Sequence, residues 1–354
     1  MCKTACSLIL GTMLAGLLLI VLAGATGATF PLPMRYMQKW AWENTWTVFS
    51  VVALVIVPWL LAIVTVPHLG SIYGQAGGGA IMLAAVFGFL WGISQFLFGR
   101  SIELVGISLS FAVVNGLSSA LGSWIPLVVQ HPGDIFSSGG LTVSAGVVSV
   151  VGGVAICSWA GHLRSRQQAP TTSAQNLFQD QSSFPRRLAI TIGSGVLAPC
   201  LNFGIAFGQK ISIAATRAES SPATSTNAVL AVVLTAGFVS NTAYCIYRLF
   251  GNRTFRLFTI GETKKYLVLG TLMGTLWIST FAIYGASSSY LGAYGTVVGW
   301  PMLMANVTII SSLLDVLYGN WTKTPLRIMA IGVVVLIGAV GVISLGMHRL
   351  QHAV

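Results

Sequence analysis

Apolar residues fall in long runs separated by short polar gaps along the whole chain. A helix that crosses a bilayer needs about 20 mostly apolar residues, and ten of the runs are long enough. The pattern predicts an all-α integral membrane protein with ten transmembrane helices. The ten predicted spans cover about 7–29, 46–66, 80–98, 104–129, 141–160, 188–208, 228–249, 265–285, 291–314 and 326–347.

The first span has a second interpretation. It follows Lys3 and ends in small residues around Ala23 and Ala25, which is also the pattern of a signal peptide. We expect a retained helix, because the rest of the chain is continuously apolar and a ten-span total needs this one.

An internal repeat appears when the chain is shifted by 186 residues. Trp91 in the third span then falls on Trp277 in the eighth, and Gly146 in the fifth falls on Gly332 in the tenth. Further glycine, valine and histidine matches lie in the same register. Low-complexity apolar sequence does not readily place all of these on one offset, so the spans are expected to form two copies of one unit.

A polar connector divides the two copies. Residues 161–187 are rich in Gln, Ser, Thr and Pro, and we expect a flexible linker there. Residues 1–160 and 188–354 are then two five-helix repeats. Because five is odd, the second repeat is inverted relative to the first. Inverted repeats allow one central site to open alternately to each side of a membrane, which favours a transporter.

Charge is scarce and its distribution predicts the orientation. Only 7% of residues are charged, against about 25% in soluble domains, which excludes a soluble enzyme. The net charge of +11 comes from Lys and Arg in the gaps, and 14 of the 18 occur in alternate loops beginning with the one after the first span. Those loops, with 161–187 among them, should be cytoplasmic, and both termini periplasmic. We expect no nucleic-acid partner.

Several tryptophan- and glycine-containing motifs recur along the chain. They are Lys39-Trp40-x-Trp42-Glu43-x-x-Trp46, Pro58-Trp59, Phe87-Gly88-x-x-Trp91-Gly92-Ile93, Gly106-x-Ser108 and Asn241-x-x-x-Cys245-x-x-Arg248, followed by Trp277, Tyr284, Trp300 and Trp321. In these motifs the chain resembles the L-rhamnose–proton symporter family of the drug/metabolite transporter superfamily, and the tryptophan-rich entry to the second span is the most specific part. The resemblance implies ten helices and ion-driven uptake of a deoxy sugar or similar monosaccharide in a bacterial cytoplasmic membrane.

A sugar site should combine aromatic rings for the C–H faces with amides for the hydroxyls. Trp91 and Gln95 are four residues apart on one helix face, and Trp277 is the repeat mate of Trp91. The alternative is that these rings belong to the interface belt or only pack, and that the amides bridge helices. At the membrane edge we expect belt anchoring, for Trp40, Trp42, Trp46 and Trp321. The substrate-binding candidates are Trp91, Gln95, Asn115, Asn202, Asn241, Trp277, Tyr284, Trp300 and Asn306.

Ion coupling needs a titratable group near membrane depth, and only seven carboxylates are available. Glu103 and Asp315, near helix ends, are the predicted coupling residues; a salt bridge of Glu103 with Arg100, or a capping role for Asp315, is the alternative. Glu43 and Lys39, four residues apart, are predicted to form a gate or structural pair. Proton coupling, sodium coupling and facilitated uptake all remain open.

Three functions compete. A monosaccharide importer driven by a cation gradient is the leading hypothesis, and an exporter or exchanger of another metabolite is the second. A membrane enzyme would need a metal cluster or acid–base constellation in the spans, and none is evident. The five cysteines show no CxxC spacing, so no resident cofactor or metal is expected, only a proton or sodium ion as the coupling ion.

Overall fold

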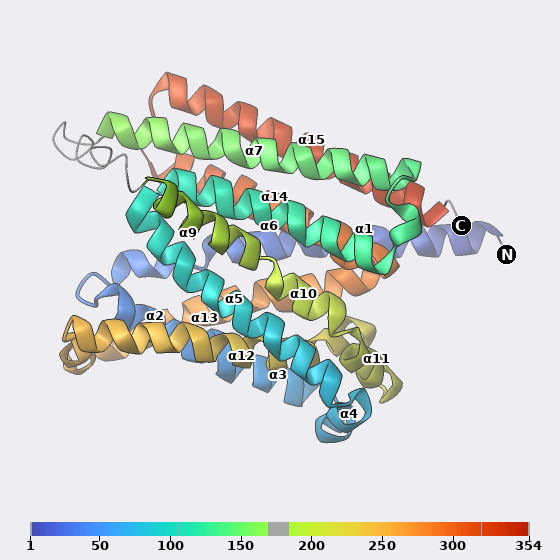
Figure 1. Ribbon diagram of the computed structural model, residues 1–354, viewed down its shortest axis with the longest axis horizontal. Coiled ribbons are helices and arrows are strands. Elements are labelled where there is room, and N and C mark those ends of the chain that lie inside the picture. The colour runs from blue at the N-terminus through green and yellow to red at the C-terminus, as the bar shows by residue number, and fades with distance from the viewer. Residues whose placement is uncertain (1, 106, 169–183, 320, 353–354) are drawn as a thin grey trace. The chain divides into compact units, whose positions relative to one another are not determined.

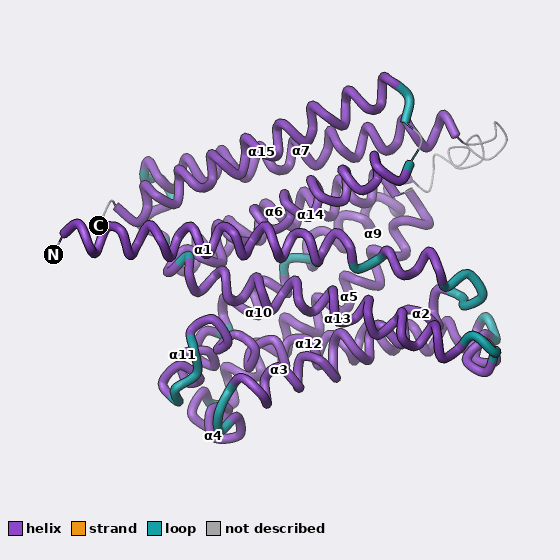
Figure 2. The backbone as a smooth tube through the Cα atoms, turned by 180° about the vertical axis from the view of Figure 1, so that it is seen from behind, coloured by secondary structure: helices purple, strands orange, loops and turns teal. Residues whose placement is uncertain are grey.

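The computed structural model describes residues 2–105, 107–168, 184–319 and 321–352, and for residues 2–10, 103, 107, 108, 166, 168, 184 and 352 it describes the backbone only. All regular structure in these residues is helical (Figure 2). Ten helices of the described chain are long and apolar enough to cross a membrane, as the sequence predicted. They divide between two compact units, each built from two separate stretches of chain.

Unit 1 comprises Met1–Ile93 and Cys200–Gly295. Its elements are α1 (Cys2–Thr29), η1 (Leu32–Tyr36), α2 (Trp42–Val51), η2 (Val52–Ile56), α3 (Val57–Thr65), α4 (Leu69–Ala76), the first part of α5 (Gly78–Val105), α10 (Cys200–Phe207), α11 (Gln209–Arg217), α12 (Pro222–Gly251), η5 (Thr254–Thr259), α13 (Thr263–Tyr290) and η6 (Gly292–Tyr294).

Unit 2 comprises Ser94–Pro199 and Thr296–Val354. It holds the rest of α5, α6 (Ile107–Gln130), η3 (Pro132–Asp134), α7 (Ser138–Gln168), α9 (Phe184–Leu197), nearly all of α14 (Gly295–Tyr318) and α15 (Lys323–His352). Each compact unit therefore takes chain from both expected sequence repeats. A repeat and a compact unit are different divisions, so the boundaries expected at 160 and 188 stay a prediction.

In unit 1, α1 packs along α13. A Cβ at Gly16 would lie 2.8 Å from Leu291 Cδ2, so the helices approach closely there. The Ser287 hydroxyl donates to the Gly16 carbonyl at 2.7 Å. One turn before the C-terminal end of α1, the hydroxyls of Thr26 and Thr280 are hydrogen-bonded at 3.0 Å.

The second and seventh spans pair side by side through a ladder of polar contacts. Asn241 Nδ2 donates to Ser50 Oγ at 2.7 Å, and Trp59 Nε1 donates to Thr235 Oγ1 at 2.8 Å. Further along, Asn227 on α12 bonds Thr65 at the end of α3. Residue numbers rise along the second span while those of their partners fall along the seventh, so the two spans are antiparallel. Interhelical bonds in membranes contribute about 0.6 kcal/mol each, so the ladder holds this pair together.

In unit 2, the fifth and tenth spans, α7 and α15, lie side by side (Figures 1 and 2). This antiparallel pair is in contact through glycines rather than through a polar ladder. Glycine recurs every seven residues along α7, at Gly139, Gly146 and Gly153. Each of these glycines faces α15, and the α15 residues they contact run in the opposite direction, from Leu350 to Leu336. A seven-residue contact spacing is that of helices supercoiled about one another. Small residues at these positions let the backbones approach closely.

Two spans are less regular than expected. The sixth was predicted as one helix over 188–208, but α9 ends at Leu197 and α10 begins at Cys200. Pro199 explains the break, because it lacks an N–H and disfavours helical geometry in the residue before it. In the second span, Pro58 follows a π-helical turn, where the Val57 N–H bonds the carbonyl of Val52.

Candidate transport site

The two repeat-mate tryptophans meet in unit 1. The rings of Trp91 on α5 and Trp277 on α13 lie 5.5 Å apart between centroids, tilted by 31°. Trp91 is 5% exposed, and Gly237 on α12 makes room for it, since a Cβ there would lie 2.8 Å from the ring. Trp277 is half-buried and also contacts the ring of Phe49. The two rings are thus in contact within unit 1, and their role in substrate binding stays a prediction.

Two candidate amides in unit 1 are already engaged with protein groups. Tyr284 Oη donates to Asn202 Oδ1 at 2.5 Å, and both side chains are fully buried. Asn202 lies in the first turn of α10, directly after the break at Pro199. Asn241 is bound to Ser50 within the polar ladder. These bonds join helices, which is the alternative role that the sequence left open.

In unit 2, Trp300 and Asn306 on α14 are held by packing. Trp300 Nε1 donates to the Ser118 carbonyl at 3.1 Å, and its ring fills the space that a Cβ at Gly122 would occupy. Asn306 donates to the Met302 carbonyl of its own helix at 2.9 Å. Neither side chain is arranged here as a free ligand group.

Gln95 and Asn115 differ from the other amides. Both are half-buried, and neither amide makes a hydrogen bond within the described part of the chain. Ser119 and Ser123 follow Asn115 at four-residue intervals on α6, and both hydroxyls are buried with no partner among the described residues. Four-residue spacing places the three side chains on one helix face. The two serines were not among the candidates predicted from the sequence, because the hydroxyl of a serine in a span usually bonds a carbonyl of its own helix.

Of the two predicted coupling carboxylates, Glu103 and Asp315, the structure describes the side chain of Asp315. The Glu103 side chain lies outside the described residues; its helix, α5, continues past Arg100 to Val105. Asp315 near the end of α14 accepts from Arg164 Nη1 on α7 at 2.6 Å. The guanidinium also lies over the Trp321 ring, 4.8 Å from its centroid, and Trp321 donates to the Asp315 carbonyl. Trp321 is thus part of an ion-pair cluster rather than a free belt residue.

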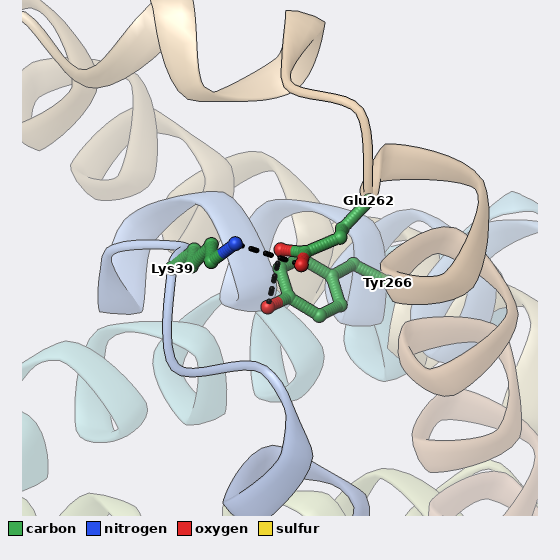
Figure 3. A network of polar contacts seen from close by, with 3 residues as sticks. All are labelled: Lys39, Glu262 and Tyr266. Atoms are coloured by element: carbon green, nitrogen blue, oxygen red, sulfur yellow. Dashed lines mark hydrogen bonds and ion pairs between the residues drawn. The ribbon is translucent and has the colours of Figure 1, made fainter.

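Lys39 does not pair with Glu43, contrary to expectation. Its Nζ lies 2.7 Å from Glu262 Oε1, and the Tyr266 hydroxyl donates to Glu262 Oε2 (Figure 3). The hydrogen bond from Lys39 lowers the pKa of Glu262, and the same bond raises the pKa of Lys39. The sequence could not reveal this partner, because 223 positions separate the two residues. Trp40, expected in the belt, is buried and donates to the Leu257 carbonyl.

Glu43 is instead buried at the start of α2. It is 2% exposed and accepts from Asn252 Nδ2 at 2.9 Å and from Thr254 Oγ1 at 2.8 Å. Both donors follow the seventh span, so these bonds close one end of the polar ladder. The neighbouring Asn44 adds a bond to the Thr254 carbonyl at 3.0 Å.

Residues typical of a metal centre do not gather in the described structure. No group of three or more His, Cys, Asp or Glu side chains is placed to hold a metal ion among the described residues. Cys157, Cys200 and Cys245 are buried free thiols.

Comparison with known proteins places the chain in a transporter family. Residues 9–349 match the family described as L-rhamnose-proton symport protein (RhaT). The L-rhamnose-proton symporter of Mannheimia succiniciproducens is 23% identical over 347 residues, which cover 95% of this chain and 99% of that protein. The L-rhamnose-proton symporter of Yersinia pestis is 22% identical, covering 95% and 98%. The chain is thus similar to these proteins over almost its entire length, and it is a multi-pass membrane protein and not an enzyme.

Proposed function

The chain belongs to the L-rhamnose-proton symport family, and from that membership we propose that it imports a monosaccharide, with L-rhamnose as the first candidate, together with a proton. The observation that carries the proposal is the match of residues 9–349 to this family. The relatives' names supply the sugar and the ion, and at 22–23% identity the particular sugar belongs to the proposal. We assign the protein to a bacterial cytoplasmic membrane.

Sugar recognition fits side chains within each unit. In unit 1, the Trp91–Trp277 pair offers an aromatic surface for the C–H face of a sugar. In unit 2, the amides of Gln95 and Asn115 and the hydroxyl of Ser119 offer hydrogen bonds to sugar hydroxyls. We propose each of these two sets as substrate contacts, while Asn202, Asn241, Tyr284, Trp300 and Asn306 act through the bonds they already make.

We propose alternating access between two inverted repeats. The α7–α15 pair supports it, because glycines that match at the 186-residue offset occupy matching faces. Gly146 and Gly332 both face the partner helix, with Ile343 and Cys157 respectively at 2.5 and 2.6 Å from where a Cβ would stand. Gly152 and Gly338 also match in sequence, and neither has an atom of another residue within 4 Å of that position.

The proposed orientation follows the loop charges. Residues 161–187 are cytoplasmic and both termini periplasmic, so the end of the polar ladder that contains Glu43 faces the cytoplasm. Lys39 and Glu262 form a contact at that same end. Glu103 and Asp315 are the coupling candidates that the sequence alone predicts. A sodium-coupled, uncoupled or exporting transporter of another metabolite is the alternative.

Counterflow in proteoliposomes tests the substrate. Vesicles loaded with a high concentration of one sugar are diluted into labelled L-rhamnose, without any ion gradient. We expect transient accumulation of label with internal L-rhamnose and reduced accumulation with sugars that differ at one hydroxyl. No counterflow of L-rhamnose by folded protein would refute the substrate, and a panel of other sugars and metabolites would then identify the alternative.

A further inference from the structure

Glu43 combines burial with the absence of an ion pair among the described residues. The carboxylates of Glu262 and Asp315 are each ion-paired and 42% exposed, whereas Glu43 is 2% exposed. Its side-chain partners are the neutral amide of Asn252 and the neutral hydroxyl of Thr254, and its own backbone N–H also bonds the carboxylate. A buried ionised carboxylate without an ion pair is costly and marks a functional site in a membrane protein.

The atoms around Glu43 suit a group that alternates between two protonation states. Both side-chain donors, Asn252 Nδ2 and Thr254 Oγ1, converge on Oε1, so neither of them occupies Oε2. In the adjacent residue, Asn44 Oδ1 is buried and lacks a hydrogen-bond partner within the described residues. This end of unit 1 therefore contains a second buried acceptor that a proton-bearing water or acid could satisfy.

Apart from Arg248, the charged groups on the elements packed against α2 are either paired with Lys39 or exposed. The elements packed on α2 are α12, α13, η2 and η5. On α12, Arg248 acts on Glu43 electrostatically and Cys245 lies close to it. At the start of α13, Glu262 and Tyr266 are bound with Lys39. The remaining charged groups nearby, all exposed, are Arg253, Arg256, Lys264 and Lys265.

We propose that Glu43 is the residue that carries the coupled proton, and this deepens the proposed proton symport on which it rests. As the carboxylate, Glu43 holds the ends of the second and seventh spans together through Asn252 and Thr254. A proton that binds Oε2 neutralises the side chain and weakens both charge-assisted bonds, because donors bond a carboxylate about twice as strongly as a neutral acid. Release of that proton to cytoplasmic water restores the closed end.

The variant Glu43→Gln tests this proposal in proteoliposomes. Glutamine keeps an acceptor oxygen but cannot titrate, so it mimics the protonated acid. We expect counterflow within about threefold of wild type, with loss of accumulation driven by a proton gradient and loss of the medium alkalinisation that sugar entry causes. Glu262→Gln is the matched control, since it removes an exposed carboxylate from the same unit, and it should keep both coupled signals.

The outcomes separate the proposals. Wild type without sugar counterflow refutes the substrate, and wild type with counterflow but no proton movement refutes proton symport. If both wild-type signals are present and Glu43→Gln retains them, the role of Glu43 is wrong. If Glu43→Gln does not fold, Glu43→Asp decides: coupled uptake with a displaced pH profile supports the proposal, and an unchanged profile overturns it.

Discussion

The glycine contact between α7 and α15 makes a prediction that can be worked out atom by atom. In Gly332→Ala, the new Cβ would lie 2.6 Å from Cys157 Sγ and 3.0 Å from the Cys157 backbone N. The thiol can rotate away, but the backbone atom moves only if the helices separate. Overpacking of this kind costs about 1–3 kcal/mol. Against it stands a gain of about 1 kcal/mol, because alanine favours a helix over glycine.

Gly338→Ala is the matched control on the same helix. It gains the same helix propensity and meets no atom within 4 Å. The two variants should therefore differ in the free energy of unfolding by the overpacking alone, about 1–3 kcal/mol. Thermal unfolding in detergent, followed by tryptophan fluorescence, should rank Gly332→Ala below wild type and Gly338→Ala at or above it. Equal melting temperatures for the two variants would show that α7 and α15 do not touch at Gly332.

Three further predictions follow from individual contacts. Ser119→Ala removes a buried hydroxyl with no partner in the described structure, so it should leave the free energy of unfolding unchanged or raise it by about 1 kcal/mol. Because we propose that this hydroxyl contacts the sugar, the variant should also show a weaker apparent affinity in counterflow; an unchanged affinity would indicate that Ser119 does not bind substrate. Tyr284→Phe leaves Asn202 Oδ1 without its donor and should lower stability by about 1–3 kcal/mol, measured by thermal unfolding. Glu262→Gln should lower the melting temperature at pH 7, because the lowered pKa of Glu262 contributes stability that is present above its ordinary value of 4.5 and is lost as the pH falls through the lowered value. An effect on the melting temperature that does not shrink as the pH is lowered below 4.5 would rule out the ion pair with Lys39.

Much of the helical content follows from the sequence, because the bilayer fixes the length of each apolar run. The ten spans were predicted on that basis. The repeat offset pairs Trp91 with Trp277, and their rings are in contact, although the repeat itself stays a prediction. Both kinds of prediction depend on local periodicity or internal similarity, which a single sequence contains.

Partner identity could not be predicted in the same way. Lys39 lies four residues from Glu43, which on a helix would favour a pair, but residues 37–41 are not helical and Lys39 reaches Glu262 instead. Arg164, the partner of Asp315, lies 151 positions away on another helix. Such contacts depend on which helices pack, and hydrophobicity does not specify that. The break at Pro199 was detectable, since proline inside a predicted span is a signal in its own right.

Gradient-driven uptake tests the central claim most directly. Purified protein in liposomes is given labelled L-rhamnose with a proton gradient, a sodium gradient or neither. If one proton accompanies each sugar, a gradient of one pH unit should drive about tenfold accumulation, while sodium alone should drive none. Equilibration without accumulation under every gradient would contradict proton symport, and accumulation under sodium alone would assign a different coupling ion.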